Sequence, residues 1–295
     1  MNSLVEIVGE ENFYIDEDMS RHTTFRAGGK AKYFVTPKNT EDLRRVIAYV
    51  REQEIKYYVI GNGSNLLVRD AGFDGVIIKI GTAFDEICLD GTVMTCGAGA
   101  FVSKIAAVAC ENSLSGLEFA AGIPGLVGGA IAMNAGAYGG EFKDIVQSVN
   151  LMDLEGNEIT LSGEEMEFEY RKSIVQKKDY IVLGTVLKLQ QGDRQEIADK
   201  MNGFLAARKE KQPLEYPSAG STFKRPEGYF AGKLIMDAGL RGFAVGGACV
   251  SEKHCGFIIN KNHATATDIE NLIEKVSNIV YDKFKVRLET EVKII

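Results

Sequence analysis

The chain has 295 residues, of which 45% are hydrophobic and 25% are charged, and its formal net charge is −7. This length predicts about two domains, and the composition excludes a chain that is disordered throughout. The acidic balance, with no run of lysine or arginine, argues against nucleic acid or an anionic membrane surface as a partner.

The cysteines and the first residues indicate a cytoplasmic location. The five cysteines are odd in number and form no CxxC pair, which is typical of reduced thiols in a cytoplasm. The opening sequence MNSLVEIVGEENF lacks the charged and apolar regions of a signal peptide. The longest mostly apolar segment, AGIPGLVGGAIAM, is broken by glycine and falls short of the ~20 residues that a transmembrane helix needs. We therefore expect no membrane span.

The pattern of the first part of the chain predicts strands with a few helices. A helix is expected over 40–53, because Thr40 can cap it and its apolar residues form one stripe, made of Leu43, Val46, Ile47 and Val50. The remaining elements expected here are strands over 56–60, 66–69, 75–80 and 92–96, a helix over 101–111, a hairpin of 145–153 with 158–161, and a strand over 179–189.

The last part of the chain has a different pattern. An amphipathic helix is predicted over 193–208, with Asp193 and Glu196 spaced as a capping box. The side chains expected to point inward from it are Ile197, Met201, Phe204 and Leu205. The elements expected after it are helices over 230–238 and 267–284, short strands near 243–250 and 256–260, and a closing strand over 286–294. This order is not a regular βα alternation, which argues against a doubly wound fold.

Residues 61–65, with the sequence GNGSN, lie between two predicted strands. A string of small residues whose backbone N–H groups face one way forms an anion nest that suits a pyrophosphate. The string does not match G-x-G-x-x-G, because residue 66 is leucine, and no Walker A sequence is present. A tight hairpin turn is the alternative interpretation.

Residues 121–139 form a long string that is poor in side-chain volume. Such a string cannot fill a core, and bare backbone polar groups need partners. A flat ligand pressed against it would supply the missing volume. The alternative is a helix of small residues packed tightly against another element.

Two further strings carry charge and hydroxyl groups. Residues 217–226 place hydroxyls and cations between two prolines, which suits a substrate with phosphates or carboxylates, although an ordinary surface loop has the same composition. Arg171, within the string YRKS, reads by itself as a surface charge. Glu289 and Glu291 share one face of the closing strand, where solvated carboxylates are the usual finding.

Signatures of other enzyme classes are missing from the sequence. It contains neither G-x-S-x-G nor H-E-x-x-H. Its three histidines, taken with Cys249 and Cys255, lack the spacing of metal ligands, so we expect no metal site.

Taken together, several strings resemble one enzyme family. They are HTTFRAGGKAKYF, GNGSNLL, AGIPGLVGGAIAMNAGAYGGE, YRKS, PSAGSTFKRP and LETEV. They occur in the order seen in the UDP-N-acetylenolpyruvoylglucosamine reductases, also called UDP-N-acetylmuramate dehydrogenases, which are flavoenzymes of bacterial peptidoglycan precursor synthesis. The resemblance spans nearly the whole chain.

The resemblance implies an α+β fold with two domains. A two-lobed FAD-binding domain of the vanillyl-alcohol-oxidase kind would occupy residues 1–191, with lobes at about 20–85 and 86–191. A smaller α+β substrate-binding domain would occupy residues 192–295, and its C-terminal strand would contribute Glu291.

The resemblance also implies the ligands. They are non-covalent FAD, NADPH as the reductant, and the UDP-sugar UDP-N-acetylglucosamine enolpyruvate, which would be reduced to UDP-N-acetylmuramate. The residues implied to bind the cofactor are Gly61, Asn62, Gly63, Ser64, Asn65, Gly122, Ile123, Pro124, Gly128, Gly129, Ala130, Asn134, Ala135 and Gly136.

Three catalytic residues follow from the same resemblance. Ser221 would donate a proton to the substrate, Arg171 would stabilise the developing charge at the substrate carboxylate, and Glu291, if protonated, would donate a hydrogen bond to it.

The candidates to bind the UDP phosphates are Lys211, Lys224, Arg225 and Lys293. Some members of the family have asparagine in place of Arg225 and arginine in place of Lys293. The interval between Arg171 and Ser221 is too short for an inserted lid, so the chain resembles the lidless branch.

Two other function classes remain compatible with the residues. One is a flavin oxidase of related fold that acts on another alcohol or sugar, and it would consume oxygen without NADPH. The other is a non-catalytic protein that binds a nucleotide sugar, and it would stay colourless after FAD is added.

Overall fold

The computed structural model describes residues 2–295, with side chains from Leu4 onward. The chain divides into two units, each with its own hydrophobic core. The first unit comprises Met1–Ile15, Tyr33–Asn62 and Gly75–Ala207, and the second comprises Asp16–Lys32, Gly63–Asp74 and Arg208–Ile295. These units are not the stretches 1–191 and 192–295 expected from the sequence, because two short N-terminal segments belong with the C-terminal part. The assignment of FAD and substrate binding to the expected domains stays a prediction.

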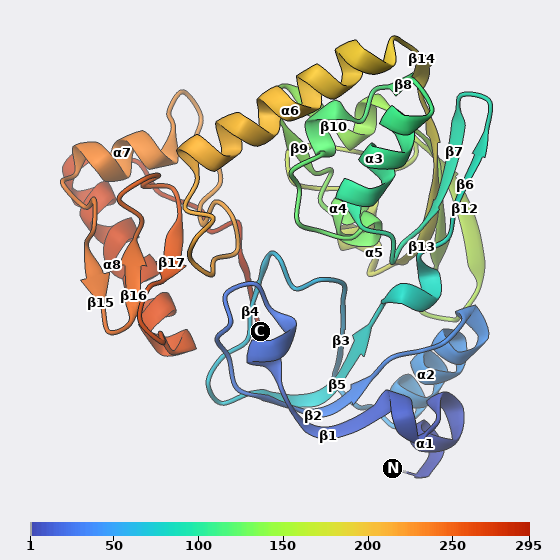
Figure 1. Cartoon of the computed structure of the whole chain (residues 1–295). Coiled ribbons are helices and arrows are strands. Elements are labelled where there is room, and N and C mark those ends of the chain that lie inside the picture. The colour runs from blue at the N-terminus through green and yellow to red at the C-terminus, as the bar shows by residue number, and fades with distance from the viewer. Residues whose placement is uncertain (1) are drawn as a thin grey trace. The chain divides into compact units, whose positions relative to one another are not determined.

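Helices and strands of the first unit largely match the expected pattern (Figure 1). Its α-helices are α1 (Asn2–Val8), α2 (Thr40–Glu52), α3 (Val102–Glu111), α4 (Val127–Ala132), α5 (Ile174–Lys178) and most of α6 (Arg194–Lys211). Its strands are β3 (Tyr57–Ile60), β6 (Ile87–Asp90), β7 (Val93–Gly97), β8 (Leu114–Ser115), β9 (Gly136–Ala137), β10 (Gly140–Glu141), β11 (Val146–Met152), β12 (Glu158–Ser162), β13 (Ile181–Lys188) and β14 (Gln190–Gln191). Short 3-10 helices are η1 (Glu10–Asn12), η3 (Thr82–Phe84), η4 (Glu118–Ala120) and η5 (Phe142–Asp144).

Elements of the second unit are shorter, apart from one long helix. They are η2 (Met19–His22), β4 (Leu66–Leu67), α7 (Ala231–Asp237), β15 (Ala244–Val245), β16 (Ala248–Val250), β17 (Ile258–Asn260), α8 (Ala266–Phe284) and β18 (Lys293–Ile294). The boundary between the units falls within three strands, which are β1 (Phe13–Asp18), β2 (Lys30–Val35) and β5 (Phe73–Lys79). These three join β3 in a sheet of order β1-β2-β5-β3.

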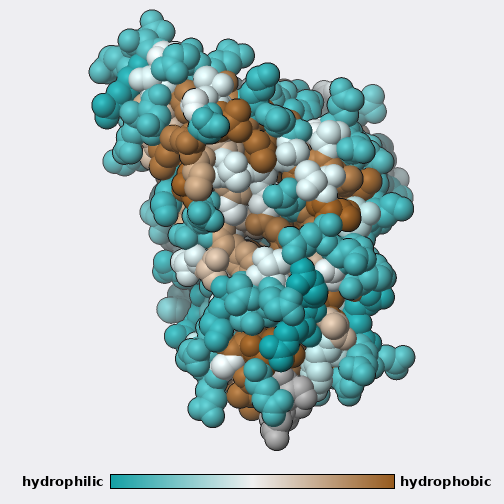
Figure 2. Space-filling view, turned by 90° about the vertical axis from the view of Figure 1, so that its right-hand side faces the viewer, coloured by the Kyte–Doolittle hydropathy of each residue, from teal (hydrophilic) through white to brown (hydrophobic). Residues whose placement is uncertain are grey.

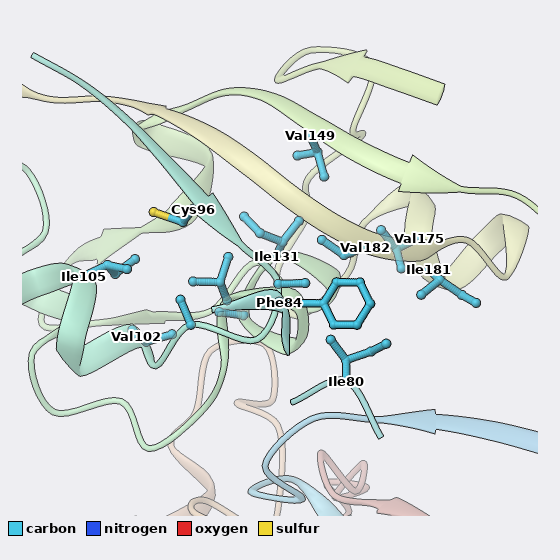
Figure 3. Close-up of a cluster of buried hydrophobic side chains, with 14 of the residues drawn as sticks. Ile80, Phe84, Cys96, Val102, Ile105, Ile131, Val149, Val175, Ile181 and Val182 are labelled. Carbon is cyan, nitrogen blue, oxygen red and sulfur yellow. The ribbon is translucent and has the colours of Figure 1, made fainter. Parts of the chain in front are cut away.

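The first unit is built around an antiparallel five-stranded sheet of order β12-β11-β13-β7-β6. The expected hairpin is present as β11 and β12, with Leu151 paired to Ile159. Helix α4 packs against β13 and β7 (Figure 1). Buried side chains from α3, α4 and this sheet gather in one cluster, and they include Val102, Ile105, Cys96, Ile131 and Val182 (Figure 3). The burial of these side chains removes apolar surface from water, which is the main stabilising contribution in such a core.

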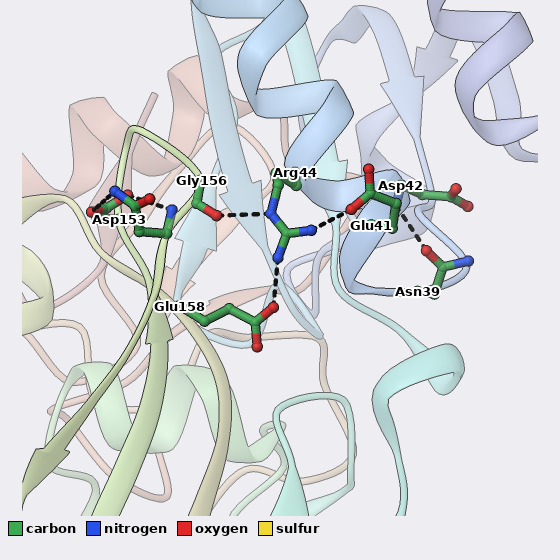
Figure 4. A network of polar contacts seen from close by, with 8 residues as sticks. Asn39, Glu41, Asp42, Arg44, Asp153, Gly156 and Glu158 are labelled. Atoms are coloured by element: carbon green, nitrogen blue, oxygen red, sulfur yellow. Dashed lines mark hydrogen bonds and ion pairs between the residues drawn. The ribbon is translucent and has the colours of Figure 1, made fainter.

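The predicted helix over 40–53 is confirmed as α2, with a correction at its start. Its stripe of apolar side chains is buried, as expected. The N-cap is Asn39 rather than Thr40, since the Asn39 side chain accepts a hydrogen bond from the Asp42 N–H at 2.8 Å (Figure 4). Asparagine is among the preferred capping residues, because its short side chain reaches the free N–H groups of the first turn.

Arg44 of α2 links this helix to the turn between β11 and β12 (Figure 4). Its guanidinium donates to the Gly156 carbonyl at 2.8 Å and to Glu158 at 2.6 Å, and it also pairs with Glu41. Several hydrogen bonds from one planar guanidinium fix its orientation better than a single surface ion pair does.

Helix α6 begins as predicted, but its inward face is smaller than expected. Asp193 caps it by accepting from the N–H groups of Gln195 at 2.8 Å and Glu196 at 3.0 Å. Ile197 is buried, whereas Leu205, which was expected to point inward, is 41% exposed. The amphipathic pattern therefore overestimated how far the core extends along this helix.

The long helix of the second unit starts earlier than the sequence suggested. Its N-cap is Thr265, which forms a capping box with Asp268. Asp70 supplies further acceptors from outside the helix: its carboxylate accepts from the N–H groups of Ala266 at 2.9 Å and Thr267 at 2.8 Å. A carboxylate at this end also complements the helix dipole.

The closing segment is less regular than the strand expected over 286–294. It contains an isolated bridge between Thr290 and Phe223, and then β18, which pairs in parallel with β4. The strand prediction is therefore correct for 293–294 and wrong for 286–289 and 291–292, which form no regular strand.

The cysteines carry no disulfide among the described residues. All five cysteines, which lie in the described part of the chain, are free thiols. Over residues 2–295 no helix is long and apolar enough to cross a membrane. On the face shown in Figure 2, hydrophobic residues form several patches that hydrophilic residues separate.

We predict that Asp70→Ala lowers the free energy of unfolding by about 1 kcal/mol near neutral pH, because the first turn of α8 loses an acceptor. Burial by itself would raise the pKa of Asp70, but the hydrogen bonds from Thr267 and Ala266 outweigh it and hold this pKa below its ordinary value. The stabilisation should therefore be complete above about pH 4, the ordinary range of the unfolded carboxyl, and should be lost as the pH falls through the lower pKa of the folded state. Urea unfolding at a series of pH values measures it.

The matched control is Asp70→Asn, which keeps a side-chain oxygen but no charge. We expect a smaller loss of stability at neutral pH for this variant. A loss for Asp70→Ala that is equal at acid and neutral pH would contradict the role given to the carboxylate.

Candidate active site

The small-residue string of the first unit is paired to a second small-residue segment. The Val102 N–H donates to the Gly125 carbonyl at 3.0 Å, and the Val127 N–H donates to the Ala100 carbonyl at 2.9 Å. The Gly128 N–H then donates to the Ala98 carbonyl at 2.8 Å. Residues 98–102 and 125–128 therefore run side by side. Their hydrogen bonds give partners to backbone polar groups of the small-residue string, which its small side chains cannot supply.

Close approach of backbone explains several of these glycines. A Cβ on Gly97 would lie 2.0 Å from the Phe84 carbonyl oxygen, and one on Gly99 would lie 1.9 Å from the Gly81 oxygen. On Gly128 it would lie 3.1 Å from the Ala98 Cβ. At these positions glycine is needed because other parts of the protein pack directly against the backbone. Tight packing of this kind is the alternative to a bound ligand that the sequence left open.

Gly129 in α4 differs from those glycines. It is exposed, and a Cβ built there would meet no described atom within 4 Å beyond its own helix and chain neighbours. The surface at Gly129 is therefore bare and open. It is a feature of this string that fits the close passage of a flat ligand.

The two strings expected to bind the cofactor contact each other in the first unit. The Asn62 side-chain amide donates to the Pro124 carbonyl at 2.6 Å. A Cβ on Gly61 would lie 3.3 Å from the Leu126 Cδ1 atom. The end of β3 and the loop before α4 thus form one continuous surface.

The remaining residues of the GNGSN string belong to the second unit. Gly63 has a φ of +61°, and a Cβ there would lie 2.0 Å from the His22 carbonyl oxygen, so glycine is required. The Asn65 side chain donates to the Glu291 carbonyl at 3.1 Å. Two strings that are far apart in sequence, GNGSN and LETEV, are therefore in contact.

Asn134 is fully buried, and the protein itself uses its side-chain amide. Its Nδ2 donates to Glu141 Oε2 at 2.6 Å and to the Glu169 carbonyl at 3.2 Å, while its Oδ1 accepts from the Lys143 N–H at 2.9 Å. A contact between Asn134 and the cofactor stays a prediction, and the backbone of Asn134 would have to make it.

Arg171 contacts the end of the small-residue string. It occupies a tight turn closed by two hydrogen bonds between Glu169 and Lys172, and its φ is +59°. Its Nη2 donates to the Gly136 carbonyl at 3.4 Å. Ser173 adds a hydrogen bond to the Ala132 carbonyl at 2.7 Å. Arg171 is thus a half-buried cation held against residues 132–136, not a free surface charge.

In the second unit, residues 217–226, here called the hydroxyl-rich string, pair with the closing segment of the chain. The Glu291 N–H donates to the Thr222 carbonyl and the Lys224 N–H donates to the Glu289 carbonyl, both at 2.8 Å. Thr222 is buried, and its hydroxyl accepts from the Ile258 N–H at 3.0 Å. The backbones of Ser221 and Glu291 are therefore neighbours, and the side chain of Ser221 is exposed.

The four candidates for phosphate binding differ in their surroundings. Lys224 forms an ion pair with Glu289, a carboxylate that the sequence placed on a solvated strand face. The Arg225 guanidinium lies over the Phe230 ring, 4.0 Å from its centroid. Lys211 and Lys293 are exposed. All four belong to the second unit.

His254 is linked to the hydroxyl-rich string through Gly256, and sequence reasoning considered it only as a metal ligand. Burial lowers its pKa, so the ring is neutral near pH 7. Its Nδ1 accepts from the Gly256 N–H at 3.1 Å, which leaves the proton on Nε2. The Gly256 carbonyl in turn accepts from the Thr222 N–H at 2.9 Å.

Sequence reasoning missed the contacts that link distant strings. The Lys224–Glu289 pair joins residues 65 positions apart, and the Asn62–Pro124 hydrogen bond spans 62 positions. Opposite charge was the one available signal for the first pair. Hydrogen bonds to a carbonyl leave no signal in the partner's residue type, because every residue has a carbonyl.

The paired small-residue segments and the open glycine beside them fit a class of protein, the FAD-binding flavoproteins. A family model described as "FAD binding domain" matches residues 31–162. A solved glucose dehydrogenase, wild-type Phl p 4.0202, has a TM-score of 0.52 at 16% identity, covering 65% of this chain and 44% of that chain. That similarity shows a shared fold.

More specific comparisons identify the family. A model described as "UDP-N-acetylenolpyruvoylglucosamine reductase, C-terminal domain" matches residues 212–295. The UDP-N-acetylenolpyruvoylglucosamine reductase of Clostridioides difficile (strain 630) is 51% identical over 293 residues, which are 99% of this chain and 96% of that protein. The reductase of Caldanaerobacter subterraneus subsp. tengcongensis is 50% identical over 295 residues, which are 100% of this chain and 97% of that protein.

A solved structure agrees with these relatives. The crystal structure of UDP-N-acetylenolpyruvylglucosamine reductase from Thermus caldophilus has a TM-score of 0.82 at 36% identity, covering 96% of this chain and 97% of that chain. The chain therefore belongs to the UDP-N-acetylenolpyruvoylglucosamine reductase family. The resemblance and the α+β fold class predicted from the sequence are confirmed, and the protein is an FAD-dependent oxidoreductase.

We predict that Gly129→Ala leaves the fold intact and weakens FAD binding at least ~10-fold, because the new methyl group occupies the open surface while the helix accepts alanine readily. Gly203→Ala in α6 is the matched control, since it too is a helical glycine whose Cβ would meet no described atom within 4 Å outside its own helix and chain neighbours. Titration of each apoprotein with FAD, followed by flavin fluorescence, gives the two dissociation constants. Equal FAD affinity in both variants would remove Gly129 from the cofactor surface.

Proposed function

We propose that this protein reduces UDP-N-acetylglucosamine enolpyruvate to UDP-N-acetylmuramate with NADPH, as a step of bacterial peptidoglycan precursor synthesis. Two full-length relatives carry the reductase name at 51% and 50% identity. The structural observation that carries the proposal is the hydrogen-bonded pairing of residues 222–224 with 289–291. This pairing sets Ser221 beside Glu291 within the region that matches the family's C-terminal domain.

The reaction adds one hydride and one proton across the vinyl group of an enol ether. Bound FAD would supply the hydride-transfer chemistry that links NADPH to the terminal vinyl carbon. The adjacent carbon then carries negative charge that is shared with the substrate carboxylate, and a proton must reach that carbon. The residues of the chain therefore have two tasks: to stabilise the charge and to deliver the proton.

Ser221 is proposed to deliver the proton. Its backbone is held in place, because the neighbouring Thr222 uses its N–H, its carbonyl and its hydroxyl in hydrogen bonds to two other segments, residues 256–258 and Glu291. The Ser221 side chain is exposed and free to meet a ligand. A serine hydroxyl is a weak acid, but the accepting carbon is strongly basic, so the transfer is downhill.

Arg171 is proposed to bind the substrate carboxylate. Its guanidinium is planar and always charged, and it presents five N–H donors that match the geometry of a carboxylate. Fixed positive charge of this kind lowers the energy of the transition state as charge develops. The hydrogen bond from the Arg171 guanidinium to the Gly136 carbonyl supports this role, because it restrains where the guanidinium lies.

Glu291 and the cations are proposed to complete substrate binding. Glu291 is half-buried, and in its protonated form it would donate a hydrogen bond to the substrate carboxylate. The UDP phosphates are assigned to Lys211, Lys224, Arg225 and Lys293. Lys224 would exchange the Glu289 carboxylate for a phosphate, so binding there replaces one anion with another.

FAD is proposed to be held without a covalent bond by the residues named from the resemblance. In the first unit these are Gly61 and Asn62, the loop and helix over 122–130, and the backbone of 134–136. The open surface at Gly129 is the observation in their favour. The cytoplasmic location and the lidless form are kept as predictions from the sequence.

We predict that Ser221→Ala leaves the reduction of the flavin by NADPH unchanged and slows its reoxidation by the enolpyruvyl nucleotide by about three orders of magnitude or more, because the proton donor is lost. Stopped-flow measurement of the two half-reactions separates these effects. Ser218→Ala, in the same loop, is the control and should change neither half-reaction. Equal slowing of both half-reactions by Ser221→Ala would remove Ser221 from the proton-donor role.

We predict that Arg171→Ala also acts on the second half-reaction, slowing it by at least ~100-fold and raising the dissociation constant of the substrate, because carboxylate charge is no longer stabilised. Arg171→Lys keeps the charge without the planar fork and should recover part of the rate. Unchanged turnover in Arg171→Ala would return this residue to the interpretation as a surface charge.

A further inference from the structure

An aromatic pair joins α6 to the hairpin β9–β10, which lies at the end of the small-residue string. The rings of Tyr138 and Phe204 are stacked, with centroids 4.5 Å apart and an interplanar angle of 7°. The two residues are 66 positions apart, and both belong to the first unit. Tyr138 is nevertheless 44% exposed, so the stack forms at the surface and not within the core.

Tyr138 forms the tip of the hairpin β9–β10. Ala137 pairs with Gly140, which leaves Tyr138 and Gly139 as a two-residue turn with φ values of +52° and +89°. Two positive φ values are typical of a type I′ turn, where asparagine and glycine are the usual residues. A tyrosine in this conformation is uncommon, and a contact that holds its ring offsets the cost of the backbone.

The base of the same hairpin contacts Arg171. The Gly136 carbonyl, in β9, accepts the hydrogen bond from the Arg171 guanidinium. Glu141, in β10, accepts from Asn134, which also donates to the carbonyl of Glu169 in the Arg171 turn. The hairpin is thus attached to Arg171 at its base and to α6 at its tip.

Helix α6 is well placed to act as the support of this hairpin. Its first half is anchored by the buried Ile197 and by the ion pair of Lys200 with Glu118 at 3.6 Å. Phe204 follows one helical turn after Lys200, on the same side of the helix. The next residue, Leu205, is 41% exposed.

We infer that Phe204, by stacking on Tyr138, is a positioning residue for Arg171, and that it sets how well the active site binds the substrate carboxylate. The inference rests on the proposed function, since it assigns Phe204 to the site that reduces the enolpyruvyl nucleotide. Loss of the stack frees the hairpin tip, and the Gly136 carbonyl that orients the guanidinium then moves with the hairpin. The carboxylate would be bound less tightly, while reduction of the flavin by NADPH would be unaffected.

The test uses the FAD-loaded enzyme and three variants of α6. Phe204→Ala should raise the dissociation constant of the enolpyruvyl nucleotide about 10-fold, measured by calorimetry on the oxidised enzyme, and should slow the second half-reaction. Phe204→Tyr keeps an aromatic ring and should restore both values. Leu205→Ala, one position away, should change neither. A purely structural role for Phe204 would slow both half-reactions and lower the melting temperature, and this result would overturn the inference.

A double-mutant cycle with Arg171→Ala decides whether Phe204 acts through Arg171. If it does, adding Phe204→Ala to Arg171→Ala causes little further loss of substrate affinity. Additive losses of affinity in the double variant would overturn the inference. Wild-type affinity in Phe204→Ala alone would overturn it too. Neither result would contradict the proposed function. If Arg171→Ala itself leaves the second half-reaction unchanged, both the inference and the role proposed for Arg171 are wrong.

Discussion

Close approach between backbone segments is the constraint on which the first unit depends. Residues 98–102 and 125–128 lie side by side, and Gly97 and Gly99 are pressed against the carbonyls of residues 84 and 81. Any side chain larger than hydrogen at those two glycines would push residues 97–99 away from residues 81–84. The pairing of residues 98–102 with residues 125–128 fixes where α4 begins, and therefore where the open surface at Gly129 is presented. The surface proposed to bind the cofactor is thus a consequence of how the backbone packs.

The roles proposed for the second unit depend on a different feature, the pairing of the hydroxyl-rich string with the closing segment. Thr222 is buried and fully engaged, so the exposed Ser221 next to it is held by a rigid neighbour. The same pairing fixes the backbone of Glu291, which Asn65 also contacts. Rigid support for an exposed reactive group is what preorganised catalysis requires. The flavin chemistry comes from the cofactor, and the chain supplies position and charge.

The sequence predicted the local elements and the family well, and it predicted the long-range contacts poorly. The stripe of α2 and the β11–β12 hairpin follow from periodicity, which is a local property. The reductase family was predicted from the order of short motifs along the chain, which can be read without a structure. The stack of Tyr138 on Phe204 and the pairing of Lys224 with Glu289 depend on tertiary packing, for which periodicity carries no signal. The inward position predicted for Leu205 was wrong for the same reason. A stripe of apolar residues on a helix does not show how far along the helix the rest of the core extends.

The most direct test of the central claim is the flavin spectrum of the purified protein under anaerobic conditions. We expect the protein to be yellow, its flavin absorbance to bleach when NADPH is added, and the absorbance to return when the enolpyruvyl nucleotide is added in stoichiometric amount. A protein that binds FAD and bleaches, but whose absorbance returns only with oxygen and not with the enolpyruvyl nucleotide, would contradict the proposed reaction. A protein that binds no FAD would contradict the cofactor surface itself.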